Sequence, residues 1–349
     1  MKTSILVTGG AGFIGSNFVH FVSRVHPDWE ITIVDKLTYA GNLENLDGLE
    51  AEKQYRFVQG DICDGNVVGP LIEEADIVVN FAAETHVDRS IENAGNFILT
   101  DVYGTYVLLE AIRQTNRPRL FVQISTDEVY GTVATGSSTE SDAIAPRNPY
   151  AASKAGADRL AYSYHTTHGV PVIVTRASNN YGARQYPEKL IPLFVTNALE
   201  DRALPLYGDG QQVRDWLHVD DHCRGIDRLI EYGIPGETYN IGGGAEVTNV
   251  ELTQRILDLL GKPHSLIRSV DDRPGHDRRY SLDTRKLRAL GWAPEVALGD
   301  GLEQTVKWYA DNDGWWKRIK SQSVEYRRFH REHYGHEPLQ HDVPPRDLA

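Results

Sequence analysis

Two side chains in the middle of the sequence have the spacing of an acid–base pair. Tyr150 and Lys154 lie four residues apart in the run YAASK, a spacing that places both on one face of a helix. A phenol has an unperturbed pKa of about 10, and a neighbouring ammonium group would lower that pKa by favouring the phenolate. We therefore expect Tyr150 to act as a base toward a hydroxyl group, although such a pair also arises by chance on helices.

Two adjacent acids, Asp127 and Glu128, follow Thr126 at the end of a predicted strand over 120–125. In an open α/β sheet, the carboxyl ends of the strands face the ligand crevice. Burial and mutual repulsion would separate the pKa values of the two carboxyl groups, so that one is protonated and the other ionised. This pattern predicts a proton donor and a base. Helix capping or a solvated surface is the alternative.

Short apolar runs alternate with helical patterns, and these elements would position the reactive groups. Strands are predicted at 4–8, 31–35, 55–59, 77–82, 120–125 and 170–176, and helices at 13–25, 65–74, 95–115 and 149–168. Strands that are apolar throughout and alternate with helices indicate a parallel sheet covered on both faces. With right-handed crossovers, the result is a doubly wound α/β fold of the Rossmann type.

The alternating pattern loosens after about residue 180. Prolines and a GDG turn at 208–210 interrupt it, and a return to the sheet is expected at 239–241, before an amphipathic helix at 251–260. We expect residues 1–180 to form the Rossmann domain, with a returning segment at about 215–243. Residues 181–330 should form a smaller, discontinuous substrate-binding lobe of mixed α/β structure, and residues 335–349 a disordered tail.

Three glycines, Gly9, Gly12 and Gly15, form the pattern G-x-x-G-x-x-G between the predicted strand at 4–8 and the helix at 13–25. Glycine lets backbone N–H groups approach a pyrophosphate, and the helix N-terminus adds partial positive charge. Alone, the pattern also fits a plain tight turn. Asp35 strengthens it, because a carboxylate at the end of the next strand accepts hydrogen bonds from ribose hydroxyls and repels a 2′-phosphate.

The predicted cofactor is therefore NAD rather than NADP. Lys36 could soften the repulsion of a phosphate, and Asp61 with Ile62 could bracket an adenine, although Asp61 also suits a turn or a cap. A nicotinamide ring would add positive charge beside Tyr150 and further favour its phenolate. Lys154 would then hold the nicotinamide ribose.

The glycine fingerprint, the YAASK run and residues 125–131 together resemble the extended short-chain dehydrogenase/reductase family. Within it, the sequence is similar to the dTDP-glucose 4,6-dehydratases, from the N-terminus to about Trp316. Simple epimerases of the family generally carry small or hydroxyl residues at positions 127 and 128. The acid pair therefore favours a dehydratase.

The resemblance implies a role for each reacting residue in an NAD-dependent lyase reaction on a nucleotide-diphosphate hexose. Tyr150 is the base for oxidation at C4, and Thr126 orients that hydroxyl. Glu128 removes the C5 proton, Asp127 protonates the departing C6 hydroxyl, and hydride returns to C6. The product would be dTDP-4-keto-6-deoxyglucose, which belongs to deoxysugar biosynthesis.

The fingerprint and the resemblance assign further residues to the two ligands. Residues expected at the NAD site are Gly9, Gly12, Phe13, Ile14, Gly15, Asp35, Lys36, Leu37, Thr38, Asp61, Ile62, Phe81, Ala82, Ala83, Glu84, Thr85, Thr100, Tyr150, Lys154 and Asn180. Residues expected at the sugar nucleotide are Thr85, Thr126, Asn179, Glu188, Lys189, Leu190, Pro205, Leu206, Tyr207, Arg214, Asn249, Asp272, Arg273, Pro274, Gly275 and His276. Arginines suit the pyrophosphate of such a ligand.

Composition and charge argue against several other classes. The 349 residues are 40% hydrophobic and 24% charged, as in ordinary globular proteins. A net charge of −13 gives no electrostatic reason to bind nucleic acid or an anionic membrane. We expect no membrane span, no signal peptide and a cytoplasmic location. Two isolated cysteines and 13 histidines without ligand spacing predict neither a disulfide framework nor a metal site.

Other readings of these patterns stay open. Another nucleotide-sugar 4,6-dehydratase, a 4-epimerase or a decarboxylase of the same family would share the fold and the cofactor. A non-catalytic dinucleotide-binding protein would commonly have lost the tyrosine or the lysine, whereas Tyr150 and Lys154 are both present. Relatives are commonly dimers that pair helices near 95–115 and 149–168, and we expect a homodimer.

Overall fold

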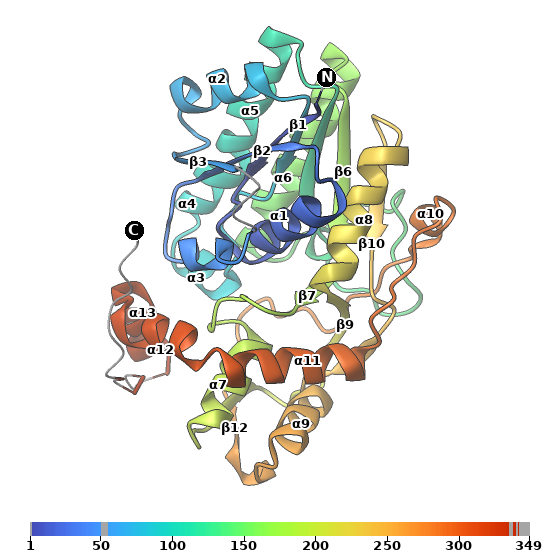
Figure 1. Cartoon of the computed structure of the whole chain (residues 1–349). Helices are drawn as coiled ribbons and strands as arrows, with labels where there is room; N and C mark the ends of the chain where they lie inside the picture. The colour runs from blue at the N-terminus through green and yellow to red at the C-terminus, as the bar shows by residue number, and fades with distance from the viewer. Residues whose placement is uncertain (1, 50–54, 335–337, 340, 342–349) are drawn as a thin grey trace.

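The structure is a computed structural model that describes residues 2–49, 55–334, 338–339 and 341 (Figure 1). Within these residues the largest element is a seven-stranded parallel sheet in the order β10-β6-β5-β4-β1-β2-β3. The strands are β1 (Ser4–Thr8), β2 (Glu30–Asp35), β3 (Tyr55–Gln59), β4 (Ile77–Asn80), β5 (Leu120–Thr126), β6 (Val172–Ala177) and β10 (Thr238–Ile241). This order confirms the doubly wound α/β fold predicted from the sequence.

Helices cover both faces of the large sheet. They are α1 (Phe13–Val25), α8 (Val219–Tyr232), α2 (Gly65–Glu74), α5 (Thr105–Thr115) and α6 (Pro149–His168). In Figure 1, α1 and α8 lie together on one face, and α2, α5 and α6 lie on the other. Ile5 and Val7 of β1 join the core on the α1 side, whereas Leu6 joins the opposite core. This two-sided burial explains why the strands are apolar throughout.

The helix predicted at 95–115 contains a π-helical interruption. It consists of α4 (Gly95–Phe97), the π-helix η2 (Ile98–Gly104) and α5. A π-helix closes i→i+5 hydrogen bonds and so changes which side chains face the core. The prediction of one regular α-helix is wrong here, because residue periodicity does not reveal the wider turn.

A smaller lobe lies beyond the carboxyl ends of the parallel strands (Figure 1). In the described part of the chain it contains a three-stranded sheet of β7 (Asn179–Tyr181), β9 (Val213–His218) and β11 (Glu246–Thr248), and a pair of β8 (Leu204–Tyr207) with β12 (Ile267–Val270). The other helices are α3 (Val87–Glu92), α7 (Leu190–Leu199), α9 (Asn249–Leu260), α10 (Arg285–Arg288), α11 (Leu298–Asp311), α12 (Asp313–Gln322) and α13 (Val324–Tyr334). This arrangement agrees with the predicted mixed lobe.

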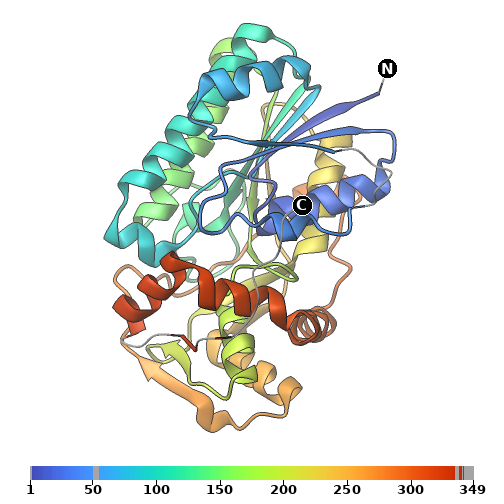
Figure 2. The ribbon, with the colours of Figure 1, turned by 60° about the vertical axis from the view of Figure 1, so that its left-hand side comes forward.

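The chain passes between the two parts more than once. After β9 it returns to the large sheet through α8, and β10 pairs with β6 at the sheet edge. Figure 2 shows α11, α12 and α13, in red, between the large sheet and the rest of the small lobe. The domain boundaries proposed from the sequence stay predictions, and most of the expected tail at 335–349 lies outside the described residues.

Candidate active site

A cavity of about 400 Å³ opens where the carboxyl ends of the large sheet meet the small lobe. Its lining extends from the glycine run after β1 to Tyr334 at the end of α13. A volume of this size suits an organic ligand. The strand order reverses between β1 and β4, and open α/β sheets bind ligands at such a switch point. The position of the cavity therefore agrees with the topology.

The turn before α1 forms a cradle for a pyrophosphate. Gly9 has a φ of +65°, and a Cβ atom there would stand 2.6 Å from the backbone nitrogen of Ala82. Glycine alone tolerates both conditions. Gly12 is the N-cap of α1, and no described side chain caps this helix. The first N–H groups of α1 are therefore available to an anion.

Asp35 is fixed beside this cradle at the end of β2. Its Oδ2 accepts a hydrogen bond from the Ala11 N–H at 2.9 Å, and its Oδ1 accepts one from the Leu37 N–H at 2.8 Å. Burial raises the pKa of Asp35. Lys36 forms an ion pair with Asp61 at 2.7 Å. The Lys36 charge is therefore balanced by Asp61 rather than by Asp35.

The start of α6 sets the positions of the tyrosine and the lysine. Asn148 caps the helix through its Oδ1, which accepts a backbone hydrogen bond at 2.8 Å, and Pro149 occupies the first helical position. Lys154 donates a hydrogen bond to the carbonyl of Ile124 at 2.7 Å. Tyr150 and Lys154 both line the cavity.

The pKa of Tyr150 differs from the expectation. Burial raises it well above its ordinary value, and the carboxylates of Glu128 and Asp101 raise it further, while a hydrogen bond with Thr126 lowers it. The expected lowering by a neighbouring ammonium is therefore wrong for this structure. Lys154 directs its hydrogen bond to a backbone carbonyl, and burial lowers its own pKa.

The acid pair occupies the short helix η3 (Asp127–Tyr130), directly after β5. The cap of η3 is Thr126, whose Oγ1 accepts a hydrogen bond from the Glu128 N–H at 3.3 Å. Burial, followed by the Glu128 and Asp215 carboxylates, raises the pKa of Asp127 well above its usual range. Asp127 Oδ2 has no hydrogen-bond partner among the described residues. A protonated Asp127 can therefore donate from this oxygen.

Glu128 is held differently from its neighbour. Its Oε2 accepts a hydrogen bond from Asn148 Nδ2 at 3.2 Å. The hydroxyl of Tyr280 lies 3.3 Å from the same oxygen, but its shorter hydrogen bond, at 2.8 Å, goes to Asp277 Oδ2. A neutral amide donor thus holds Glu128 as an acceptor, which suits a base. Both acids line the cavity, so a donor and an acceptor of protons meet at its wall.

Polar atoms that lack a partner gather around the same cavity. Asn179 Oδ1, Asn249 Oδ1 and His222 Nε2 are buried without a hydrogen-bond partner in the described part of the chain. Buried polar atoms normally find partners, so these atoms indicate a polar ligand. His222 Nδ1 contacts Asn180 Oδ1 at 2.9 Å, and burial lowers the pKa of His222 to about 3. A neutral His222 thus orients Asn180.

Two arginines supply positive charge on the small-lobe side. Arg214 is buried and donates to the carbonyls of Val213 and Asp277 at 2.8 and 2.9 Å, and no described carboxylate forms an ion pair with it. Arg273 lies 3.3 Å from Asp88 Oδ1, while its Nε lacks a partner among the described residues. Incompletely paired buried cations are costly. A diphosphate would complete both guanidinium groups.

The C-terminal helix α13 contributes to this end of the cavity. The Tyr207 hydroxyl lies 3.2 Å from Asp88 Oδ2 and 2.6 Å from His333 Nε2. Tyr334 lines the cavity directly.

His276 lines the same end of the cavity from another segment. Burial lowers the pKa of His276 to about 4, and its Nδ1 contacts Asp272 at 2.5 Å.

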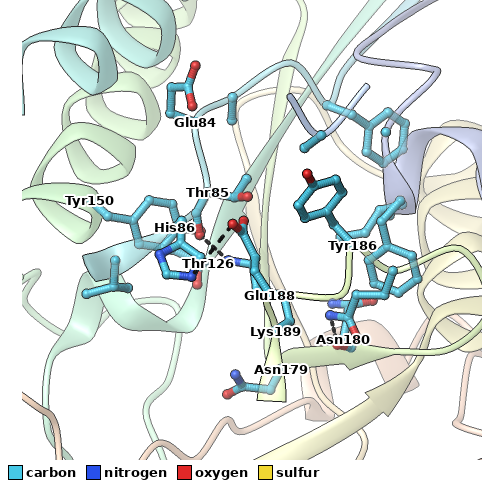
Figure 3. A pocket seen from close by; sticks show the side chains of 18 of the residues that line it. Glu84, Thr85, His86, Thr126, Tyr150, Asn179, Asn180, Tyr186, Glu188 and Lys189 are labelled. Carbon is cyan, nitrogen blue, oxygen red and sulfur yellow. Dashed lines mark hydrogen bonds and ion pairs between the residues drawn. The ribbon is translucent and has the colours of Figure 1, made fainter. Parts of the chain in front are cut away.

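Glu188 and Lys189 form a charged part of the wall. Glu188 accepts hydrogen bonds from the Tyr39 hydroxyl at 2.9 Å and from Arg89 Nη2 at 3.2 Å. Figure 3 shows Glu188 and Lys189 beside Thr126, with Lys189 reaching toward the backbone of Thr85. Figure 3 also shows Tyr150 extending from α6 toward this group. The charged wall and the Tyr150 phenol therefore share one space.

Most predicted site residues line this one cavity, but four do not. The exceptions are Leu37, Asp272, Pro274 and Gly275. Leu37 and Asp272 instead hold Asp35 and His276, which do line it. Residue spacing does not distinguish a lining residue from its support, and the ligand contacts expected of these four residues stay predictions.

Several lining residues were not assigned from the sequence. They include His86, Val87, Asp88, Gln185, Tyr186, Ile191, Leu193, Phe194, Trp216, His222 and Tyr334. His86, Val87 and Asp88 directly follow the predicted cofactor residues Phe81–Thr85, so their position along the chain could have suggested them. Tyr334 carried none, because its position depends on how α13 folds back over the small lobe.

The fold and the site define a class: a Rossmann-type dinucleotide enzyme with a tyrosine–lysine pair and an acid pair in its cleft. A model of the GDP-mannose 4,6 dehydratase family matches residues 6–305, and the chain belongs to this family. A dTDP-glucose 4,6-dehydratase of Streptomyces niveus is 53% identical over 322 residues, which cover 91% of this chain and 96% of that protein.

Solved structures extend the comparison. A dTDP-glucose 4,6-dehydratase of Streptomyces venezuelae, crystallised with NAD bound, is 52% identical with a TM-score of 0.88, covering 91% of this chain and 100% of that chain. A UDP-glucuronic acid 4-epimerase of Bacillus cereus is 28% identical with a TM-score of 0.84, covering 88% and 99%. Because both enzymes share the fold, the choice of reaction depends on the site residues.

Proposed function

We propose that this protein converts dTDP-glucose to dTDP-4-keto-6-deoxyglucose with NAD as its cofactor. The observation that carries the proposal is the grouping of Tyr150, Asp127 and Glu128 around one cavity that also contains the glycine cradle. Oxidation of a hydroxyl needs a base, and elimination of water needs a base and an acid. The three side chains supply these groups.

The cofactor proposal rests on the fit of the residues to NAD. The bare N-terminus of α1 suits a pyrophosphate, and Asp35 offers acceptor oxygens for ribose hydroxyls while opposing a 2′-phosphate. Lys154 and Tyr150 line the same cavity, and the nicotinamide would lie beside them. NAD supplies the acceptor for hydride from C4 and the donor of hydride to C6.

Tyr150 would take the proton of the C4 hydroxyl, and Thr126 would orient both groups. Burial raises the pKa of Tyr150 in this structure, so the phenolate needs positive charge beside it. Lys154 and an oxidised nicotinamide ring supply that charge when the site is assembled. The resulting C4 ketone acidifies the C5 hydrogen, which makes the next proton transfer feasible.

Glu128 and Asp127 would divide the elimination between them. Glu128, held by the amide of Asn148, removes the C5 proton. Asp127 keeps its proton because burial raises its pKa, and it protonates the departing C6 hydroxyl. The difference in surroundings explains how adjacent carboxyl groups take opposite roles.

The nucleotide would occupy the small-lobe end of the cavity. Arg214 and Arg273 suit the diphosphate, and Asn249 offers an unpaired amide oxygen. Tyr207 presents an aromatic ring for a base or ribose. The preference for thymine over other bases is proposed from the named relatives of this chain.

The proposal is tested with purified protein, NAD and dTDP-glucose. A 4-keto product that absorbs in alkali should form, and UDP-glucose and GDP-mannose should react far more slowly. Glu128→Gln should reduce product formation by about 100-fold or more, the scale of general base catalysis, while C4 oxidation continues. Turnover that survives this substitution would remove Glu128 from the proposed role.

A 4-epimerase is the second candidate, because the epimerase of Bacillus cereus shares the fold closely. Such an enzyme inverts C4 and leaves the C6 hydroxyl in place. The buried, protonation-prone Asp127 beside Glu128 has no task in that reaction. Product analysis by NMR separates the two, since only dehydration converts C6 to a methyl group.

We also propose that the protein is a homodimer. The exposed apolar side chains on η2, α5 and α6 are Ile98, Leu99, Tyr103, Tyr106 and Tyr162. A contiguous exposed apolar patch commonly marks an interface, and these helices are the ones expected to pair. A cytoplasmic location is proposed as well, because Cys63 and Cys223 are free thiols that suit a reducing compartment.

A further inference from the structure

In the π-helix η2, an acidic side chain is buried while neighbouring apolar side chains are exposed. Asp101 is only 2% exposed, whereas Ile98 and Leu99 in the same segment are 57% and 49% exposed. Burying a carboxylate is costly unless it is paired or hydrogen-bonded, and η2 gives up regular α-helical geometry to achieve it. π-helical turns occur frequently at functional sites. The buried Asp101 therefore needs an explanation other than stability.

Asp101 joins two segments that line the cavity. Its Oδ1 accepts a hydrogen bond from the Glu84 N–H at 2.9 Å, and its Oδ2 accepts one from the Ser153 hydroxyl at 2.6 Å. Glu84 belongs to the loop that follows β4 and lines the cavity, and Ser153 lies between Tyr150 and Lys154 on α6. One carboxylate thus ties the cofactor loop to the helix that carries the tyrosine and the lysine.

The charges around Asp101 come from two directions. On α6 it faces Lys154, and from the loop after β4 it faces Glu84. Tyr150 and Lys154 in turn face Glu128 and Asp127 from η3, Asp101 from η2, and Asp158 from α6 itself. Burial raises the pKa of Asp101 to about 6, against the opposing influence of Lys154. Asp101 is therefore an anion at neutral pH.

We propose that Asp101 is a positioning residue for the proposed reaction: its carboxylate clamps the Glu84 loop onto α6 and supplies the negative charge that balances buried Lys154 beside Tyr150. This inference rests on the proposed role of Tyr150 as the base. The negative charge keeps Lys154 cationic in spite of its burial, and it makes loss of a proton from the Tyr150–Lys154 pair harder. Asp101 therefore helps to set the pH at which the pair becomes active.

Asp101→Asn tests the charge while it keeps the shape. Asparagine Oδ1 can still accept from the Glu84 N–H, and Nδ2 can donate to the Ser153 oxygen. The Ser153 hydroxyl proton would then turn from residue 101 to the Tyr150 carbonyl, which lies 2.8 Å away. The rising limb of the pH profile of C4 oxidation should move to lower pH by about one unit, the scale expected for a nearby buried charge. The falling limb of the pH profile of overall turnover, set by Asp127 in the elimination step, should stay in place.

Glu92→Gln is the matched control. Glu92 is an exposed acid on α3, a helix that also packs against α6. Glu92→Gln also removes one negative charge, but from the protein surface, and it should leave the rising and the falling limb of the pH profiles unchanged. An Asp101→Asn variant whose profile coincides with that of the wild type, or one whose shift Glu92→Gln reproduces, overturns the electrostatic role.

Ser153→Ala tests the clamp separately, because it removes one hydrogen bond and keeps the Asp101 side chain. The dissociation constant for NAD, measured by fluorescence titration, should rise about 3- to 10-fold, the effect of one lost buried hydrogen bond, and the rising limb should move less than in Asp101→Asn. Unchanged NAD affinity in Ser153→Ala overturns the proposed clamp. This test does not depend on Asp101→Asn, so it stands even if that variant does not fold. A wild-type protein that binds NAD but never oxidises dTDP-glucose would instead refute the proposed function.

Discussion

Asp127 and Glu128 differ in their surroundings more than in their chemistry, and the reaction depends on that difference. Burial and neighbouring carboxylates keep a proton on Asp127. Activity should therefore fall at alkaline pH as Asp127 loses its proton. Asp127→Asn should leave C4 oxidation in place and lower elimination by about 100-fold, the scale of general acid catalysis. Reduced-cofactor absorbance and the keto product, measured on one sample, separate the two steps; equal loss of both would contradict the assignment.

The same residue predicts a pH-dependent cost to stability. Its pKa is raised on folding from 3.8, so between that value and the folded pKa the protein must take up a proton to fold. The cost grows with pH, by about 1.4 kcal/mol per unit. Asp127→Asn removes the cost, so its free energy of unfolding in urea should exceed that of the wild type by at least about 1 kcal/mol at pH 7. The gap should shrink toward pH 4, and a constant gap would contradict the buried charge state.

At the scale of single residues, the sequence predicted the types of group and that one acid of the pair would keep its proton, but it did not predict the pKa of Tyr150. Asp127, Glu128, Tyr150 and Lys154 all line one cavity, as their spacing and resemblance predicted. The direction of the Tyr150 pKa was wrong, because burial and three-dimensional neighbours determine it. Asp101 was not singled out, since its burial follows from a π-helical turn.

At the scale of elements, the cradle before α1 gives a direct prediction. A Cβ atom on Gly9 would press on the backbone of the loop after β4, and its φ is unfavourable for other residues. Gly9→Ala should weaken NAD binding by about 10-fold, which corresponds to about 1.4 kcal/mol of strain. Titration calorimetry measures this affinity.

Gly69→Ala provides the matched control within α2, where an added Cβ meets nothing within 4 Å. It should leave NAD affinity unchanged, since α2 lies away from the glycine cradle. If both alanines weaken NAD binding equally, the close approach at Gly9 is not the cause.

Most elements of the large sheet follow from local sequence. The helices at 13–25, 65–74 and 149–168 have the predicted bounds, because apolar periodicity, Asn148 and Pro149 mark them. The π-helix and the sheets of the small lobe could not be predicted from the sequence in the same way. β7, β9 and β11 form a sheet from distant segments, and no local pattern specifies such pairing.

At the scale of the whole molecule, the apolar patch on η2, α5 and α6 predicts the assembly. Leu99→Asp places a charge in the proposed dimer interface and should shift the protein from dimer to monomer in sedimentation velocity. Ile234→Asp is the control, because Ile234 is also an exposed apolar residue but lies after α8, away from the patch. A monomeric wild type, or equal dissociation in both variants, would contradict the proposed interface.

The proposed reaction requires one sugar to stay bound through oxidation, elimination and reduction, and a single cavity between the large sheet and the small lobe contains all the groups assigned to these steps. dTDP-glucose carrying deuterium at C4 tests this sequence of steps directly. The hydrogen removed at C4 should return to C6 of the same product, so NMR should find deuterium in the new methyl group. Deuterium retained at C4, or released to solvent, would contradict dehydration by internal hydride return.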